Sequence, residues 1–140
     1  MAEGDLSAVL QIQAQTGFQH WSLQQFQQEL ALDYSLDFVL TSATIIQGFA
    51  IWHWLGDEAE LCAIAIDPSV QKTGLGSFML KSMHQNLRQR GAQRFFLEVR
   101  ASNVAALALY NKMGYQSVGV RRKYYSDGEN AVLMAWGEGG

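Results

Sequence analysis

Apolar residues at helical spacing mark the start of the chain. A first helix is predicted there, because Val9 and Leu10 follow Leu6 by three and four residues, the spacing of one helix face. Residues 22–25 read Ser-Leu-Gln-Gln, a capping-box sequence that predicts the start of a second helix, because the serine and the second glutamine can each satisfy a free backbone N–H. Glutamines on the other side of this second helix indicate a face in contact with water.

The pattern then changes to strands. Apolar runs separated by turn residues predict three strands, at residues 38–40, 48–55 and 59–66. Because a short turn can only reverse the chain direction, we expect these strands to be antiparallel neighbours. Asp67-Pro68 ends the third strand, since proline has no N–H to donate and restricts the residue before it.

A longer helix is predicted at residues 77–90, and Gly91 is its expected C-terminal cap. The apolar stripe of this helix is predicted to comprise Leu75, Phe78, Met79, Met83 and Leu87. Such a helix is long enough to connect two parallel strands in a right-handed crossover, so the strand before it and the strand after it are expected to be parallel.

Four further elements complete the expected order. They are a strand at residues 94–99, a short apolar helix at residues 104–113, and two strands at residues 115–125 and 131–136 around the turn Ser126-Asp127-Gly128. Helices and strands alternate in this half, whereas hairpins dominate the first half. The sequence therefore predicts an α+β or mixed α/β domain with one central sheet.

Composition narrows the class of protein. A chain of 140 residues, 49% of them hydrophobic, can bury one core, and we expect residues 1–140 to form a single soluble domain. A net charge of −3 argues against nucleic-acid binding through overall charge. No apolar run approaches the roughly 20 residues of a membrane span, and no signal sequence opens the chain, so we expect a cytoplasmic protein that acts as a monomer away from membranes.

Cysteine and histidine give no sign of a metal site. Cys62 is the only cysteine and lies inside an apolar run, so it predicts a small core residue rather than a disulfide or a nucleophile. His20, His53 and His84 are far apart and lack cysteine or acidic partners at ligand spacing, and we expect no bound metal.

The most informative motif lies between the third strand and the long helix. Glycines that allow close backbone approach, followed by the free N–H groups of a helix start, favour a bound diphosphate. The residues of this loop are Gln71, Lys72, Thr73, Gly74, Leu75 and Gly76.

Two common phosphate loops fit this motif poorly. A nucleotide-hydrolysing loop places a lysine directly after its last glycine, whereas Lys72 precedes both glycines here. A dinucleotide-binding turn is a closer alternative, with Glu98 at a suitable distance, but its third glycine is replaced by Met79 and antiparallel hairpins precede the loop.

The Gln-x-x-Gly-x-Gly loop resembles the acyl-coenzyme A loop of the GNAT acetyltransferase superfamily. The resemblance continues through residues 97–103, residues 105–110, Gly114-Tyr115 and residues 121–134. These segments are similar to the ribosomal-protein-alanine N-acetyltransferases, the RimI-type enzymes. The resemblance implies the GNAT fold, with a central mixed sheet flanked by helices.

The same resemblance implies roles for individual residues. The backbone of Ile64, Ala65 and Ile66 is expected to contact the pantetheine arm of acetyl-CoA, and the loop from Gln71 to Gly76 its diphosphate, with Lys72 adding charge. Asn103 is implied as a further coenzyme A contact and is also a suitable helix cap. Glu98 is implied as the general base and Tyr110 as the proton donor to the thiolate, although an ion-paired strand residue and a core tyrosine are the structural alternatives.

The implied function is transfer of acetyl from acetyl-CoA to an N-terminal alanine α-amine, that of the eighteenth small-subunit ribosomal protein. Two alternatives are an acetyltransferase acting on lysine side chains or small amines, and a non-catalytic coenzyme A-binding regulatory module. The chain departs from the family pattern at His20, where a proline is usual, and at Asn130, where an acid is usual. Both positions fall where the family handles its acceptor.

Overall fold

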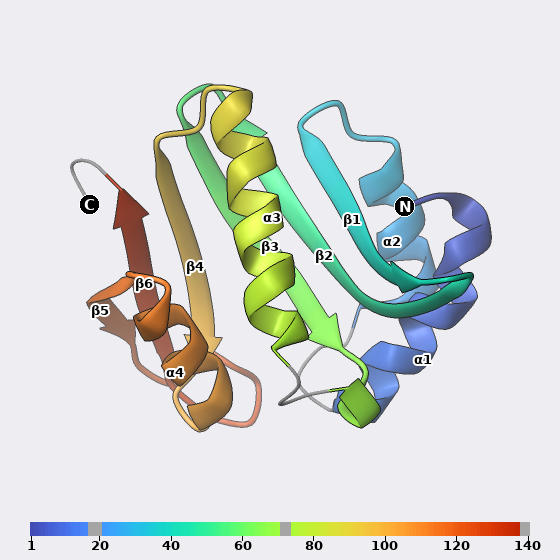
Figure 1. Ribbon diagram of the computed structural model, residues 1–140. Coiled ribbons are helices and arrows are strands. Elements are labelled where there is room, and N and C mark those ends of the chain that lie inside the picture. The colour runs from blue at the N-terminus through green and yellow to red at the C-terminus, as the bar shows by residue number, and fades with distance from the viewer. Residues whose placement is uncertain (17–20, 71–73, 138–140) are drawn as a thin grey trace.

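A six-stranded mixed sheet forms the centre of the computed structural model, which describes residues 1–16, 21–70 and 74–137 (Figure 1). The strand order is β1-β2-β3-β4-β6-β5. Only β3 and β4 pair in parallel, and the other neighbours are antiparallel. The predicted mixed sheet and the predicted parallel crossover are therefore confirmed. The strands are β1 (Ser35–Ser42), β2 (Ile45–Leu55), β3 (Glu58–Ile66), β4 (Arg94–Arg100), β5 (Gln116–Arg121) and β6 (Ala131–Gly137).

Helices cover both faces of the sheet. On one face, α1 and α2 bury Leu6, Val9 and Phe26 against the first three strands. On the other face, α3 and α4 pack over the centre of the sheet (Figure 1). The helices are α1 (Leu6–Thr16), α2 (Leu23–Leu30), α3 (Leu75–Gln89) and α4 (Val104–Lys112), with short 3₁₀ turns at Glu3–Asp5 and Pro68–Val70.

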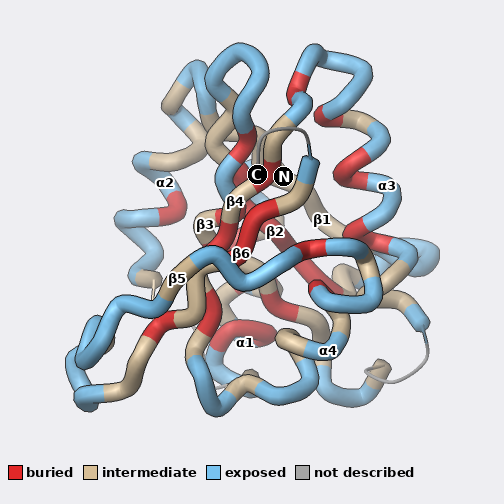
Figure 2. The backbone as a smooth tube through the Cα atoms, turned by 90° about the vertical axis from the view of Figure 1, so that its left-hand side faces the viewer, coloured by how far each residue is buried: buried red, intermediate tan, exposed pale blue. Residues whose placement is uncertain are grey.

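Strand β2 shows how the two cores are built from one strand. Phe49 and Ile51 point into the cluster under α1 and α2, whereas Ala50 and Trp52 point into the cluster under α3. Both faces of the strand are covered, and all four side chains are fully buried. This explains why the run is continuously apolar and does not alternate with polar residues. Figure 2 shows the same contrast across the sheet, with buried central strands and an exposed β5 at the edge.

The helix ends follow the predicted caps. Ser22 Oγ accepts a hydrogen bond from the Gln25 backbone N–H, and the Gln25 side chain accepts one from the Ser22 N–H, which completes the capping box. Asn103 Oδ1 accepts from the Ala106 N–H and caps α4. The two N-terminal helices are tied together by Gln13, whose side-chain amide is buried and bonds both backbone groups of Trp21.

Two predictions of local structure are wrong. Strand β5 ends at Arg121 and not at residue 125, because Lys123 adopts a left-handed backbone with φ of 51° and its N–H bonds the Asn130 side chain in place of a strand partner. Phe78 is 59% exposed and does not belong to the buried stripe of α3. Leu80 and His84 are buried there instead. The face of α3 that packs on the sheet is therefore turned by a fraction of a turn from the predicted one, and Met79, Met83 and Leu87 belong to both.

An aromatic cluster surrounds His84 in the core under α3. The imidazole is 5% exposed, stacks on Phe95 with ring centroids 4.0 Å apart, and lies edge-on to Trp52 and Trp136. Its Nε2 is 2.6 Å from the Tyr115 hydroxyl, so one hydrogen bond serves both buried groups. Burial, together with the positive charge of Arg88, lowers the pKa of His84 to about 4.

This low pKa predicts a specific pH dependence of stability. The unfolded chain takes up a proton at His84 near its ordinary pKa of 6.5, whereas the folded chain resists it until about 4. The contribution of His84 to the free energy of unfolding is therefore fully present above pH 6.5 and decreases by about 3 kcal/mol as the pH drops to 4. Denaturant unfolding of wild type and His84→Gln between pH 7.5 and 4 should show a loss about 3 kcal/mol larger in wild type, because carboxylates with a lowered pKa, such as Asp127 and Glu129, titrate in both proteins. An equal loss in both proteins would contradict it.

Candidate active site

The two parallel strands at the centre of the sheet part before either of them ends. The ladder between β3 and β4 runs from Glu58↔Arg94 to Leu61↔Leu97, and beyond these positions the strands diverge (Figure 1). We call the diverging ends, residues 62–66 of β3 and 98–100 of β4, the sheet opening. Backbone groups along a strand that lacks its neighbour are available to a ligand.

A bulge in β3 explains where the strands part. Trp52 pairs with Leu61 and Ile51 with Ala63, so Cys62 is the extra residue. A bulge bends its strand and increases the local twist, which turns the rest of β3 away from β4. Leu61 and Ala63 are two residues apart and would normally point to the same face of the sheet. Because of the bulge, Leu61 packs in the core under α3 and Ala63 in the core under α1. Burial raises the pKa of Cys62 to about 12, which agrees with a structural thiol rather than a nucleophile.

The N-terminus of α3 lies beside this opening. Gly74 is the N-cap residue with φ of 86°, in the left-handed region that glycine adopts freely, and it has no side chain of its own to cap the helix. A Cβ on Gly76 would be 3.2 Å from Ile66 Cδ1 and 3.6 Å from Leu109 Cδ2, so glycine allows α3 to approach both β3 and α4 closely. The first N–H groups of a helix and the helix dipole make this end suitable for a phosphate. Gln71, Lys72 and Thr73 lie outside the described residues.

Glu98 and Tyr110 lie on opposite faces of the sheet. Leu97 and Val99 point into the core under α3, so Glu98, between them on β4, points to the other face. Tyr110 on α4 belongs to the α3 side and is 3% exposed. Burial raises the pKa of Tyr110 above its ordinary value, so the phenol stays protonated throughout the physiological range.

Comparison with known proteins decides the family. Residues 6–115 match the family described as acetyltransferase (GNAT). The chain belongs to this family. It is 40% identical to the ribosomal protein bS18-alanine N-acetyltransferase of Escherichia coli strain K12 over 134 residues, 94% of this chain and 90% of the relative. The corresponding protein of Haemophilus influenzae is 38% identical over 135 residues, 94% of this chain and 91% of the relative.

Solved structures agree with the sequence comparison. The crystal structure of the ribosomal-protein-S18-alanine N-acetyltransferase from Escherichia coli superimposes with a TM-score of 0.89 and 38% identity, over 98% of this chain and 90% of that chain. The fold expected from the sequence is thereby confirmed. The protein is an acetyl-CoA-dependent N-acetyltransferase.

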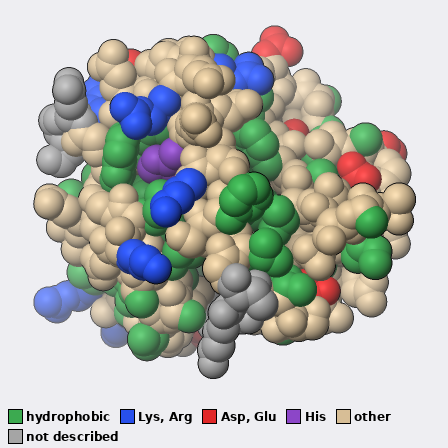
Figure 3. Space-filling model, viewed as in Figure 1, with side chains coloured by type: hydrophobic (Ala, Val, Ile, Leu, Met, Phe, Trp, Pro, Cys, Tyr) green, Lys and Arg blue, Asp and Glu red, His purple; other side chains and the backbone are tan. Residues whose placement is uncertain are grey.

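The sheet opening and the start of α3 fit acetyl-CoA. Ile64 and Ala65 lie on the part of β3 that has left β4, where a pantetheine arm can bond the backbone as a strand would, and Ile66 is the last residue of that strand. Surface charge agrees with this, because Lys and Arg side chains gather over the half of the face that carries α3 and α4 (Figure 3). Lys81, Arg88 and Lys112 are the exposed cations of these two helices. A positive surface attracts the phosphates of coenzyme A.

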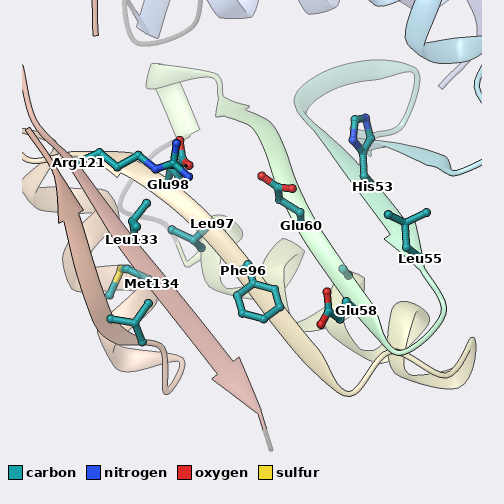
Figure 4. A pocket seen from close by; sticks show the side chains of 12 residues that line it. His53, Leu55, Glu58, Glu60, Phe96, Leu97, Glu98, Arg121, Leu133 and Met134 are labelled. Atoms are coloured by element: carbon teal, nitrogen blue, oxygen red, sulfur yellow. Dashed lines mark ion pairs between the residues drawn. The ribbon is translucent and has the colours of Figure 1, made fainter. Parts of the chain in front are cut away.

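A cavity of about 310 Å³ lies on the face of the sheet that Glu98 occupies (Figure 4). Its walls are partly apolar and carry three carboxylates and one guanidinium. Figure 4 shows Arg121 reaching toward Glu98, and Arg121 Nε is 3.5 Å from Glu98 Oε1. The lining residues include His53, Leu55, Glu58, Glu60, Phe96, Glu98, Val118, Arg121 and Leu133.

Sequence reasoning missed several residues of this cavity. The sequence assigned no role to Arg121 or to the side chain of His53, yet Arg121 pairs with Glu98, and His53 Nε2 is 2.8 Å from Glu29 Oε2. The Tyr124 hydroxyl lies beside Glu98, whose hydrogen bonding and negative charge raise the pKa of Tyr124. The alternation of side chains along each strand indicates which face a residue occupies. It does not show that β5 pairs with β6, and this pairing is what brings Arg121 close to Glu98.

The departure at Asn130 has a structural explanation. Its Oδ1 accepts a hydrogen bond from the Lys123 N–H at 3.0 Å, which an aspartate at this position would also do. The amide therefore preserves the closure of the chain between β5 and β6. His20, the second departure, lies outside the described residues. Within the ranges that the structure describes, no group of three or more His, Cys, Asp or Glu side chains is arranged to hold a metal ion.

Proposed function

We propose that this acetyltransferase acetylates the α-amine of the N-terminal alanine of ribosomal protein bS18. The observation that carries the proposal is 40% identity, over 94% of the chain, to a protein named for that reaction. The position of Glu98 supports it, since this carboxylate lies at the sheet opening and lines the cavity on the open face, where an acceptor amine can enter. The proposed catalytic residues are Glu98 and Tyr110.

The chemistry favours a terminal amine. An α-amine with a pKa near 8 is about one-tenth neutral at pH 7, whereas a lysine near 10.4 is neutral less than about one time in a thousand. One carboxylate is therefore sufficient to remove the remaining proton from a terminal amine at neutral pH. A carboxylate that lines a cavity can also attract the ammonium form before deprotonation.

Each bond change has a proposed partner. The amine nitrogen forms a bond to the acetyl carbon as the bond from that carbon to sulfur breaks. Glu98 accepts the proton that the nitrogen loses, directly or through water, and Tyr110 donates the proton that the departing thiolate gains. The transfer takes place within one ternary complex, so no covalent acyl-enzyme forms. Holding both reactants in the opening supplies much of the rate through proximity.

We further infer a cytoplasmic location and action as a monomer, with residues 1–140 forming one domain. The proposed acceptor supports the location, because ribosomal proteins are made and assembled in the cytoplasm. No helix in the described part of the chain is long and apolar enough to cross a membrane. We expect Asn103, at the start of α4, to contact coenzyme A in addition to capping the helix.

A panel of acceptors tests the proposed reaction. With labelled acetyl-CoA, a peptide beginning with alanine should be modified at its α-amine only, and the same peptide with a blocked terminus and a free internal lysine should not react. Turnover should rise between pH 7 and 8 as the α-amine loses its proton. Mass spectrometry of the product identifies the modified nitrogen. Preferential modification of lysine or of a free polyamine would support the small-amine alternative, and no turnover with any amine would support a regulatory module.

Substitution of the two proposed catalytic residues tests their roles. Glu98→Gln should lower kcat/KM by about a hundredfold or more at pH 7, with a smaller defect at pH 9, because more of the amine is then already neutral. Tyr110→Phe should lower kcat by at least about tenfold with little change in the KM for acetyl-CoA. Steady-state kinetics measure both effects. Glu3→Gln, which changes an exposed acid in the 3₁₀ turn before α1, is the control, and full activity of either catalytic variant would remove that residue from the mechanism.

A further inference from the structure

Arg100 joins strand β4 to the chain between β5 and β6. We call residues 122–130 the β5–β6 loop. Arg100 Nη1 donates hydrogen bonds to Asp127 Oδ2 at 2.8 Å and to Glu129 Oε2 at 3.1 Å. Its guanidinium carbon is 4.1 Å from the centre of the Tyr125 ring. One side chain therefore contacts three residues of the loop, through two charged hydrogen bonds and one stacking contact.

The loop is also fixed to the segment that follows β4. Glu129 Oε1 accepts a hydrogen bond from the Ser102 backbone N–H at 2.7 Å, and the Asn130 carbonyl accepts one from the Ala101 N–H. Glu129 therefore bridges Arg100 and Ser102 with its two oxygens. These contacts restrict both the position of the loop and its distance from β4.

The restricted loop and the end of β5 that leads into it carry side chains that contact Glu98. Arg121 pairs with Glu98 from the end of β5, and Tyr124 lies beside the same carboxylate from within the loop. Arg100 is two residues beyond Glu98 on β4, so both side chains point to the same face of the sheet. The arginine thus sets where the loop stands relative to the proposed base.

Stability alone does not account for this arginine. Arg100 is only 13% exposed, and its Nε–H is buried without a hydrogen-bond partner among the described residues. A buried donor without a partner destabilises the folded state. The loop also contains Lys123 in the left-handed backbone region, which is unfavourable for a residue with a side chain. The arrangement holds in place a loop that contains an unfavourable backbone conformation.

We propose that Arg100 is a positioning residue for the acceptor, because it holds the β5–β6 loop against the wall of the cavity at Glu98. The inference rests on the proposed function, which places the acceptor amine at Glu98. Arg100 itself touches neither of the reacting groups in this account. Its loss should release the loop and weaken acceptor binding, and it should leave the acetyl-CoA side, on the other face of the sheet, unchanged.

Kinetics and limited proteolysis together test this role. Arg100→Gln should raise the KM for an alanine-terminal peptide by about tenfold and leave the KM for acetyl-CoA within about twofold of wild type. Trypsin should cleave the folded variant faster than wild type after residues 121–123, the basic residues where β5 ends and the loop begins, because a released loop is more accessible to the protease. Arg100→Lys should show part of both effects, since lysine keeps the charge but lacks the planar fork.

Arg94 provides a matched control on the same strand. It pairs with Asp57 and Glu58 at 3.0 Å each, at the opposite end of β4 from the loop. Arg94→Gln should leave both KM values and the cleavage after residues 121–123 as in wild type. If Arg100→Gln does not fold, Glu129→Gln removes one partner of the same contact and should raise the acceptor KM to a smaller extent.

Three results would overturn the proposal. They are faster cleavage of the loop with an unchanged acceptor KM, an equal rise in both KM values, and an Arg100 variant that behaves like Arg94→Gln in both assays. Failure of the proposed function is distinguishable from these, because it appears in the wild-type protein as the absence of terminal-amine acetylation before any variant is compared.

Discussion

The parting of β3 from β4 is the constraint on which the rest of the structure depends. A parallel pair in the middle of a sheet would normally continue its ladder to the strand ends, but the extra residue at Cys62 twists β3 away after Leu61. On the edge that faces β4, the backbone of residues 62–65 no longer pairs with that strand and can bond an extended ligand. In this acetyltransferase the arm of acetyl-CoA is of the right kind, because an extended chain with amide groups can add to a strand edge.

The surrounding elements make the opening usable. Gly76 allows α3 to begin close to Ile66, so the N-terminus of this helix lies where the phosphate end of the cofactor is expected. The aromatic cluster around His84 fixes α3 to the sheet, and Tyr115 within this cluster also lies against Tyr110, with ring centroids 5.6 Å apart. The cofactor side of the sheet is thus rigid and well packed. The proposed acceptor side is an open cavity, and at its Glu98 wall stands Tyr124, which belongs to a loop that a few charged contacts hold in place.

Sequence reasoning was most successful where a function depends on consecutive residues. The caps at Ser22 and Asn103 and the succession of helices and strands along the chain could be predicted, because each reflects backbone requirements that a few neighbouring residues satisfy. Glu98 and Tyr110 were singled out by family resemblance, and the structure adds that they occupy opposite faces of the sheet. Contacts between distant segments were not predictable in this way. The bulge at Cys62 and the bonds from Arg100 to the β5–β6 loop depend on strand register and on tertiary packing, which the pattern of one strand does not encode.

The central claim is that the sheet opening holds the acetyl thioester between a base on one face and a phenol on the other. A crystal structure of the protein with a bisubstrate analogue, in which coenzyme A is joined through an acetyl linker to an alanine-terminal peptide, tests it most directly. The account predicts that the pantetheine arm bonds the backbone of residues 64–66, with the linker between the Glu98 carboxylate and the Tyr110 hydroxyl and the peptide in the cavity beside Arg121. A linker bound away from the opening, or one with Glu98 and Tyr110 both remote from it, would contradict the account.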